Sequence, residues 1–195
     1  MNDRYTKTAI LLHWLIALGI FTMFGLGWFM SELPKEALAQ MSYDLFNMGI
    51  YTWDLAKEAS PRAFYFNLHK SIGVTVLVFI LLRVLWRIGH KPPELPAGIK
   101  AWESKLSKAT HHFLYLLMFA MPLSGLVMAV SSKYGVKWFG TKLIPGINSE
   151  TLRDVFHEVH EIVGITLILI IVLHIAGALK HKIIDKNDIM KRMLP

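Results

Sequence analysis

The sequence predicts an all-α integral membrane protein, built as a bundle of four transmembrane helices in one domain over residues 1–195. Three observations support this fold class. Hydrophobic residues make up 54% of the chain and charged residues only 18%, whereas soluble domains carry about 25% charged residues. Four apolar segments are each long enough to cross a bilayer. The basic residues lie at or beyond the ends of these segments.

The four apolar segments are expected to form helices at about 8–30, 66–88, 110–131 and 157–179. A helix needs about 20 residues to cross about 30 Å of hydrocarbon, and each segment satisfies this length. The stretches between them are polar and contain proline or glycine, which interrupt helices and allow the chain to turn back. The tail 180–195 is short, polar and basic.

The first apolar segment has to be distinguished from a cleaved signal peptide. Arg4 and Lys7 precede it, and Ala37-Leu38-Ala39 beyond it resembles a small-residue cleavage site. The apolar run, however, spans about 23 residues, whereas the apolar region of a signal peptide usually has about 7–15. We therefore expect this segment to be the first transmembrane helix.

The distribution of basic residues predicts the orientation. Of the 21 Lys and Arg residues, 13 fall in the N-terminal arm, the second loop with its approaches, and the tail, whereas 8 fall in the first and third loops. Cytoplasmic loops carry the excess of Lys and Arg, so both termini are expected in the cytoplasm, with the helices in a bacterial inner membrane. Membrane topology thus accounts for the net charge of +7, and no nucleic-acid partner is expected.

The first loop has about 35 residues, which is long for a connection. We expect it to contain a short helix that lies at the outer surface of the membrane. Tyr43, Phe46, Tyr51 and Trp53 are expected to anchor this helix, because Tyr and Trp favour the membrane interface.

Four histidines, His13, His69, His160 and His174, lie inside the apolar segments. An ionisable side chain is costly there and usually faces the bundle interior, where it has a function. In the expected orientation, His13 and His174 lie near the cytoplasmic face, and His69 and His160 lie near the outer face. The 14 residues from His160 to His174 correspond to about 21 Å of rise, and the two imidazoles lie only about 40° apart around the helix.

Each depth-matched pair can ligate one iron, so the pattern predicts two haems b with two axial imidazoles each, an arrangement suited to electron transfer. The chain has no Cys, which excludes thiolate ligands, iron–sulfur clusters and the attachment motif of c-type haem. His157 is the alternative to His160, but it lies 17 residues before His174 and points about 100° away from it. The other interpretation of each single histidine is a hydrogen-bonded core or interfacial residue.

Further motifs accompany these histidines on all four predicted helices and in the tail. In chain order they are His13-Trp14, His69-Lys70-Ser71-Ile72-Gly73, Arg83-Val84-Leu85-Trp86-Arg87, His111, Tyr115, Ser124-Gly125, His160, His174, Lys180-His181, Asp185 and Met190-Lys191-Arg192-Met193. In these residues the chain resembles the bacterial cytochrome b561 family, which includes a superoxide oxidase. It is also similar to the cytochrome b subunits of nickel–iron hydrogenases and formate dehydrogenases. The resemblance covers nearly the whole chain and implies the same two pairings of histidines on two haems b.

Three more polar residues near the expected haems have several interpretations. Arg83 lies 14 residues after His69 on the same helix face, at the inner level. The resemblance implies that it pairs with a propionate of the inner haem; otherwise it extends to the interface. Lys70 pairs with an outer propionate, attracts an anionic reactant, or is an interfacial lysine. His111 lines a quinone pocket, serves as a proton donor, or contacts lipid headgroups.

The expected function is one-electron transfer across the bilayer. A quinone is expected to exchange electrons at the inner side, and a periplasmic electron donor or superoxide at the outer side. The haems carry the chemistry, while the protein sets ligation, burial and access. The sequence leaves open whether the chain is an enzyme, such as a superoxide:quinone oxidoreductase. The alternatives are a membrane-anchor subunit that connects a soluble dehydrogenase or hydrogenase to quinone, and a non-redox transporter or scaffold.

Overall fold

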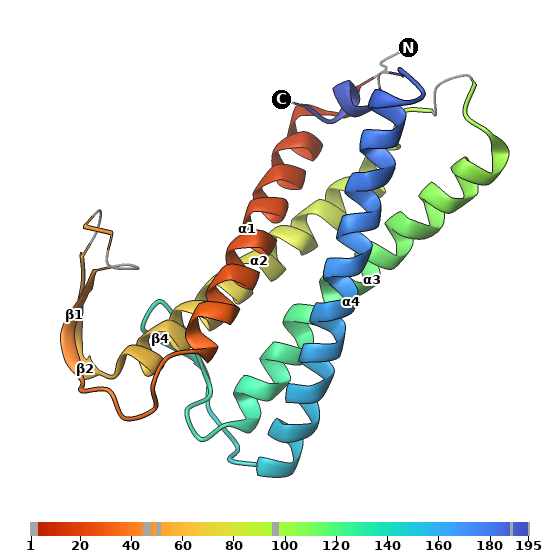
Figure 1. Cartoon of the computed structure of the whole chain (residues 1–195). Helices are drawn as coiled ribbons and strands as arrows, with labels where there is room; N and C mark the ends of the chain where they lie inside the picture. The colour runs from red at the N-terminus through yellow and green to blue at the C-terminus, as the bar shows by residue number, and fades with distance from the viewer. Residues whose placement is uncertain (1–3, 45–47, 50–51, 95–97, 188, 195) are drawn as a thin grey trace.

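The computed structural model describes residues 4–44, 48–49, 52–94, 98–187 and 189–194. It contains four long helices: α1 (Lys7–Ser31), α2 (Pro61–Gly89), α3 (Ala101–Ser131) and α4 (Glu150–Ile183). All four are long and apolar enough to cross a membrane, which confirms the predicted fold class. Both chain ends lie at one end of the bundle, hereafter the terminus end, and the hairpins described below lie toward the other, hereafter the hairpin end (Figure 1).

Three helices begin earlier than predicted. α2, α3 and α4 start at Pro61, Ala101 and Glu150 rather than near residues 66, 110 and 157. The apolar run marks only the part of a helix that lies in hydrocarbon, and residues outside that run extend each helix by one to three turns. Local capping sets the start of α2, because Ser60 Oγ accepts from the Ala63 amide at 3.2 Å, and likewise that of α1, because Thr6 Oγ1 accepts from the Ala9 amide at 3.3 Å.

The prediction of a short surface helix in the first loop is wrong for the described part of that loop. The chain instead forms an antiparallel hairpin of β1 (Gln40–Asp44) and β2 (Thr52–Ala59), which projects to one side of the bundle (Figure 1). Strand residues alternate between two faces, and Trp53 and Leu55 of β2 pack on the same apolar cluster. That period of two favours a strand over a helix.

Aromatic residues of this loop pack against the helix bundle. Tyr43 is buried, and its ring stacks on Phe64 of α2 with centroids 4.5 Å apart. The Tyr43 hydroxyl also donates to the Ala59 carbonyl across the hairpin. Trp53 packs edge-on against Phe64 at 6.1 Å. Phe46 and Tyr51, two of the expected anchors, lie outside the described residues.

A second hairpin, β3 (Val136–Trp138) and β4 (Thr141–Ile144), connects α3 to α4. It is joined to the first half of α2 by hydrogen bonds. The Phe139 amide donates to Ser71 Oγ at 2.9 Å, and the Trp138 indole donates to Thr75 Oγ1 at 3.1 Å. This hairpin therefore covers the segment of α2 that contains His69.

The middle of the bundle is a layer of apolar side chains. α1 packs most extensively on α2, and α3 on α4. One central cluster contains Ile16, Val76 and Ile80, and the other contains Leu114, Leu117 and Leu167. Ile20 and Met118 contact both clusters and so join the two helix pairs. Many large apolar side chains remain exposed on the helices, as expected for a surface that faces lipid.

Candidate functional site

The helices carry their polar and small residues at two levels. Each helix contributes two positions that are 14 residues apart, and that spacing returns them to nearly the same helix face. They are His13 and Gly27 on α1, His69 and Arg83 on α2, His111 and Gly125 on α3, and His160 and His174 on α4. Because neighbouring helices are antiparallel, the eight positions gather into one set toward the hairpin end and one toward the terminus end.

The hairpin-side pair consists of His69 on α2 and His160 on α4. Their ring centroids lie 6.4 Å apart, and the rings are inclined at 73°. Glycines make room for both imidazoles. A Cβ placed on Gly27 would lie 3.5 Å from His69 Cε1, and one on Gly125 would lie only 2.9 Å from His160 Cε1.

The nitrogens of this pair are in different environments. His69 Nδ1 is buried and has no hydrogen-bond partner among the described residues. His160 Nδ1 lies 3.0 Å from Ser124 Oγ on α3. A buried imidazole nitrogen without a partner is costly unless something else binds the ring. This orphaned nitrogen therefore favours a further group that binds the His69 ring.

The terminus-side pair consists of His13 on α1 and His174 on α4. Their centroids also lie 6.4 Å apart, with the rings inclined at 67°. A third imidazole lies at this level, because His111 of α3 is 5.3 Å from His174. His111 Nδ1 donates to the Ser107 carbonyl at 2.7 Å, which leaves its Nε2 as an acceptor.

The spacing of both pairs fits a group held between two imidazoles. Imidazole nitrogens bind transition metals at about 2 Å, so two rings on opposite sides of one metal have centroids about 6 Å apart. The 6.4 Å separations of His13–His174 and His69–His160 agree with this geometry. The 5.3 Å separation of His111 and His174 is shorter, which places His111 beside the terminus-side pair rather than in it.

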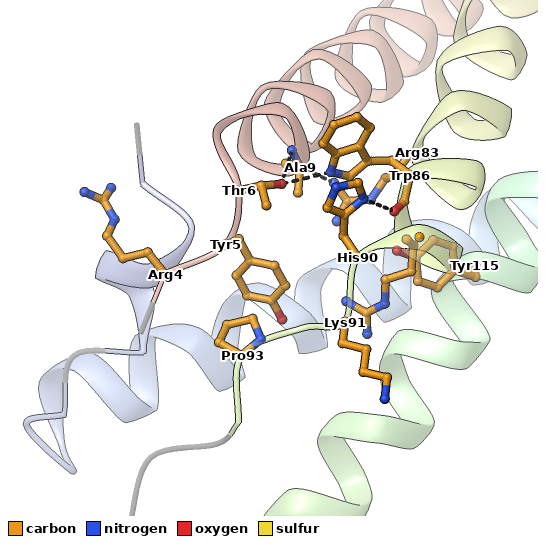
Figure 2. A pocket seen from close by; sticks show the side chains of 12 residues that line it. Arg4, Tyr5, Thr6, Ala9, Arg83, Trp86, His90, Lys91, Pro93 and Tyr115 are labelled. Carbon is orange, nitrogen blue, oxygen red and sulfur yellow. Dashed lines mark hydrogen bonds between the residues drawn. The ribbon is translucent and has the colours of Figure 1, made fainter. Parts of the chain in front are cut away.

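Arg83 lies at the terminus-side level, as expected. Its guanidinium donates to the Ala9 carbonyl of α1 at 3.0 Å. It also lines a pocket of about 380 Å³ at the terminus end (Figure 2). Four cationic residues and no acidic residue line this pocket, and those four are Arg4, Arg83, Arg87 and Lys91. Such a wall suits a carboxylate or phosphate group.

Aromatic residues complete the pocket. Trp86 donates its indole hydrogen to Thr6 Oγ1 at 2.9 Å, and its ring stacks on His90 with centroids 4.0 Å apart (Figure 2). Tyr115 of α3 and Tyr5 of the N-terminal arm also line the space. The pocket thus joins the start of α1, the end of α2 and the middle of α3.

Two other sequence candidates, Lys70 and His157, lie on the helices that carry the hairpin-side pair. Lys70 is half-buried, and its ammonium donates to the Gly135 carbonyl at 3.3 Å just before β3. The second hairpin therefore holds this cation in place. His157, the rival of His160, is exposed, whereas His160 is half-buried and faces His69.

An ionic cluster closes the terminus end of α3 and α4. The Lys180 ammonium contacts the buried Glu103 carboxylate and lies 2.8 Å from Asp185 Oδ2, which also lies 2.7 Å from His181 Nδ1. Lys180 therefore takes the place that a metal ion would occupy among these acidic groups. Its hydrogen bond is the main reason that the pKa of Asp185, just beyond α4, is lowered.

The tail that follows α4 returns to the start of α1. The Tyr5 amide donates to the Arg192 carbonyl at 3.2 Å, and the Trp14 indole donates to the Met193 carbonyl at 2.8 Å. Trp14 also meets the neighbouring His13 edge-on at 5.3 Å. The tail therefore contributes to the surroundings of the terminus-side pair.

Two depth-matched imidazole pairs in a four-helix membrane bundle define the class of multi-pass membrane cytochromes. A family model described as prokaryotic cytochrome b561 matches residues 4–195, and the chain belongs to this family. The family implies transmembrane electron transfer with haem b as the iron-containing cofactor.

Three relatives have similar lengths. Cytochrome b561 homolog 2 of Escherichia coli K12 is 30% identical over 194 residues, with 98% of this chain and 92% of the relative covered. Cytochrome b561 homolog 1 of the same organism is 26% identical, with 99% and 98% covered. A probable superoxide oxidase CybB of Yersinia pestis is 24% identical, with 100% and 98% covered.

Several residues at the two levels had no functional role predicted from the sequence. Ser124 was part of a family motif only, and Gly27 had no assignment. The 14-residue spacing could have identified the two glycines, since Gly27 lies 14 residues after His13 and Gly125 lies 14 residues after His111. The bond from Ser124 to His160 had no such signal, because it depends on how α3 and α4 pack.

Proposed function

We propose that this protein passes electrons one at a time across a bacterial inner membrane through two haems b. His69 and His160 would hold one haem, and His13 and His174 the other. The observation that carries this proposal is the 6.4 Å centroid separation found in both pairs. A bound haem supplies one-electron redox chemistry at its iron.

The protein's own part is to hold the imidazoles and limit access to them. Two imidazoles held on one haem iron would favour electron transfer over oxygen binding. Gly27 and Gly125 supply the space for the hairpin-side rings. The apolar layer around Ile20 and Met118 separates the two levels. The 14-residue spacing on α4 corresponds to about 21 Å between the levels.

At the terminus end we assign a quinone as the redox partner. His111 is exposed beside the terminus-side pair and can form a hydrogen bond to a quinone oxygen. Arg83, which lies at the same level, is suited to a haem propionate. Replacing His111 with Ala should slow reoxidation of the reduced protein by a soluble quinone and leave both haem spectra intact. An unchanged rate would remove His111 from this role.

At the hairpin end we assign superoxide or a periplasmic electron-donor protein. The relative from Yersinia pestis carries the description of a probable superoxide oxidase. Lys70 and Lys137 are close enough for their charges to interact, and such a basic region attracts small anions. Lys70→Glu should slow haem reduction by superoxide, and the difference from wild type should shrink as salt rises. A reduction rate that depends neither on Lys70→Glu nor on the salt concentration would favour a protein donor.

The orientation is part of the same proposal. The excess of Lys and Arg on the terminus side supports cytoplasmic termini. A C-terminal reporter that is active only in the periplasm should therefore remain silent, and a reporter placed in the β1–β2 hairpin should be active. The opposite pattern would reverse the two sides.

The decisive test is spectroscopic. The purified protein should contain two low-spin b haems per chain, seen in a pyridine haemochrome assay and a reduced-minus-oxidised spectrum. One haem or none would refute the proposal. Stable co-purification of a soluble dehydrogenase or hydrogenase would instead support the anchor-subunit alternative, in which the same haems connect that partner to quinone.

A further inference from the structure

Ser124 of α3 makes a specific contact with one of the four proposed ligands. Its side chain is buried, with 4% of the residue exposed. Ser124 Oγ donates to the Met121 carbonyl at 2.8 Å and lies 3.0 Å from His160 Nδ1. A hydroxyl has one hydrogen to donate. Since that hydrogen goes to Met121, the contact with His160 requires His160 Nδ1–H to be the donor.

This direction fixes the tautomer of His160. A neutral imidazole carries one hydrogen. With the hydrogen on Nδ1, Nε2 is left with a free lone pair, and Nε2 is the atom that can bind iron. The hydroxyl of Ser124, together with the Met121 carbonyl, which also accepts from His160, therefore favours the form of His160 that can act as a ligand.

The residue next to Ser124 fixes the position of the same ring. A Cβ on Gly125 would lie 2.9 Å from His160 Cε1 and 3.3 Å from Nδ1, so the imidazole rests directly on the α3 backbone. Gly125 thus sets how closely the ring approaches α3, and Ser124 sets its rotation. Two adjacent residues of α3 orient a side chain of α4.

The other three proposed ligands have no such support in the described part of the chain. His160 alone among the four has a hydrogen bond to its imidazole there. Hydrogen bonds from the second ring nitrogen orient a metal-bound histidine and raise its basicity as a ligand. A more basic ligand stabilises the ferric state relative to the ferrous state.

We propose that Ser124 is a positioning residue for the hairpin-side haem, which holds the His160 tautomer and lowers the reduction potential of that haem. The inference rests on the proposed function, because it requires His160 to be an iron ligand. It concerns one haem only, so the potential of the terminus-side haem provides an internal reference in every measurement.

The test compares three variants of the intact, haem-loaded protein. Ser124→Ala removes the hydroxyl, and Ser124→Thr keeps it. Ser132→Ala is the matched control, because Ser132 Oγ also donates to a carbonyl three residues earlier, that of Ala129 at 2.7 Å, and has no bond to a histidine. Each protein is titrated potentiometrically and examined by low-temperature electron paramagnetic resonance. The hairpin-side haem is identified as the component that disappears in His160→Ala.

In Ser124→Ala the potential of the hairpin-side haem should rise, with a tenfold change in the ferric-to-ferrous ratio corresponding to about 59 mV. Its ferric resonance should also change, and Ser124→Thr should restore both. Loss of that haem in Ser124→Ala alone, with recovery in Ser124→Thr, supports the same role. Unchanged potentials, or a shift equal to that in Ser132→Ala, overturn the inference. So does loss of the haem in both Ser124 variants. Failure of wild-type protein to bind two haems would refute the proposed function instead.

Discussion

The two levels of the bundle share one dimension and differ in their surroundings. The histidine centroids of each pair lie 6.4 Å apart. The hairpin-side pair is enclosed by Gly27, Gly125 and Ser124 and is covered by the second hairpin. The terminus-side pair instead has a third imidazole, a guanidinium level with it and a cationic pocket nearby.

The shared spacing and the different surroundings correspond to two properties of each site, namely which group it would bind and what it would exchange with its environment. The equal spacing of the two histidine pairs would suit the same group at both levels. The variable surroundings would determine what each site exchanges with its environment. A tightly packed site around a hydrogen-bonded ligand favours electron passage alone. A site with His111, Arg83 and an adjacent pocket can also accommodate polar or charged groups.

The strongest test of the comparison removes one ligand from each level. His69→Ala and His13→Ala should each reduce haem content by about half, because each removes one of the two imidazoles that would hold one haem while the other pair stays intact. Pyridine haemochrome assays and difference spectra measure the result. His157→Ala is the control and should retain both haems. If one substitution removed both haems, the two levels would not be independent sites.

The second test concerns the space around the hairpin-side pair. Gly125→Ala places a methyl group against the His160 ring, and overpacking of this kind costs about 1–3 kcal/mol. We expect the hairpin-side haem to be lost or to become high-spin, as seen in the absorption spectrum. The terminus-side haem should be unaffected.

Substitutions at two other glycines provide comparisons for Gly125→Ala. Gly27→Ala should have a milder effect, since its Cβ would lie at an ordinary contact distance of 3.5 Å from His69. Gly25→Ala should have none, because nothing lies within 4 Å of the added carbon. Equal effects of all three would show that general helix packing, rather than the fit of His160, is responsible.

The third test changes the charge at the terminus-side level. Arg83→Gln removes a positive charge that favours reduction, so the potential of the terminus-side haem should fall. A shift of about 59 mV corresponds to a tenfold change in the ferric-to-ferrous ratio. Arg87→Gln is the control at an exposed position one turn later. Potentiometric titration should show a larger shift for Arg83→Gln and none for the hairpin-side haem. Equal shifts for the two haems would contradict the assignment of Arg83 to one level.

The smallest effect is expected at the ionic cluster that fixes the tail. Asp185→Asn removes the carboxylate that Lys180 and His181 contact, and tryptic cleavage after Lys186 or Lys191 should accelerate by less than about fivefold. Because the folded-state pKa of Asp185 is lowered, its stabilising effect is present above the ordinary carboxyl pKa and is lost as pH falls through the lowered value. Protection of the wild-type tail, probed in this acidic range by hydrogen exchange because trypsin is inactive there, should therefore weaken on acidification, whereas that of Asp185→Asn should not change from this cause.

The helices and histidine pairs were accessible to sequence reasoning for a geometric reason. A span of hydrocarbon fixes the length of an apolar run, and 14 residues return to nearly the same helix face. Those two rules predicted that His160 would face His69 and that His174 would face His13, and the structure has both contacts. The rules do not specify haem count, redox partners or orientation, which stay predictions.

The connections were not accessible in the same way. The first hairpin depends on Tyr43 stacking on Phe64, and the second depends on the Phe139 amide reaching Ser71. Both contacts join residues that are distant in sequence, so no local pattern identifies them. The expectation of a surface helix relied on length and aromatic content alone, and did not use the alternation of Trp53 and Leu55 in β2.

The apolar layer around Ile20 and Met118 has a consequence for energy conversion. Apolar side chains carry no group that can relay a proton. Under the proposed function, an electron that moves between the levels therefore carries its charge across the membrane field without a compensating proton. Moving one charge through the full potential involves about 2.3 kcal/mol per 100 mV. Electron flow through this bundle would then be electrogenic, and its direction and rate would respond to the membrane voltage.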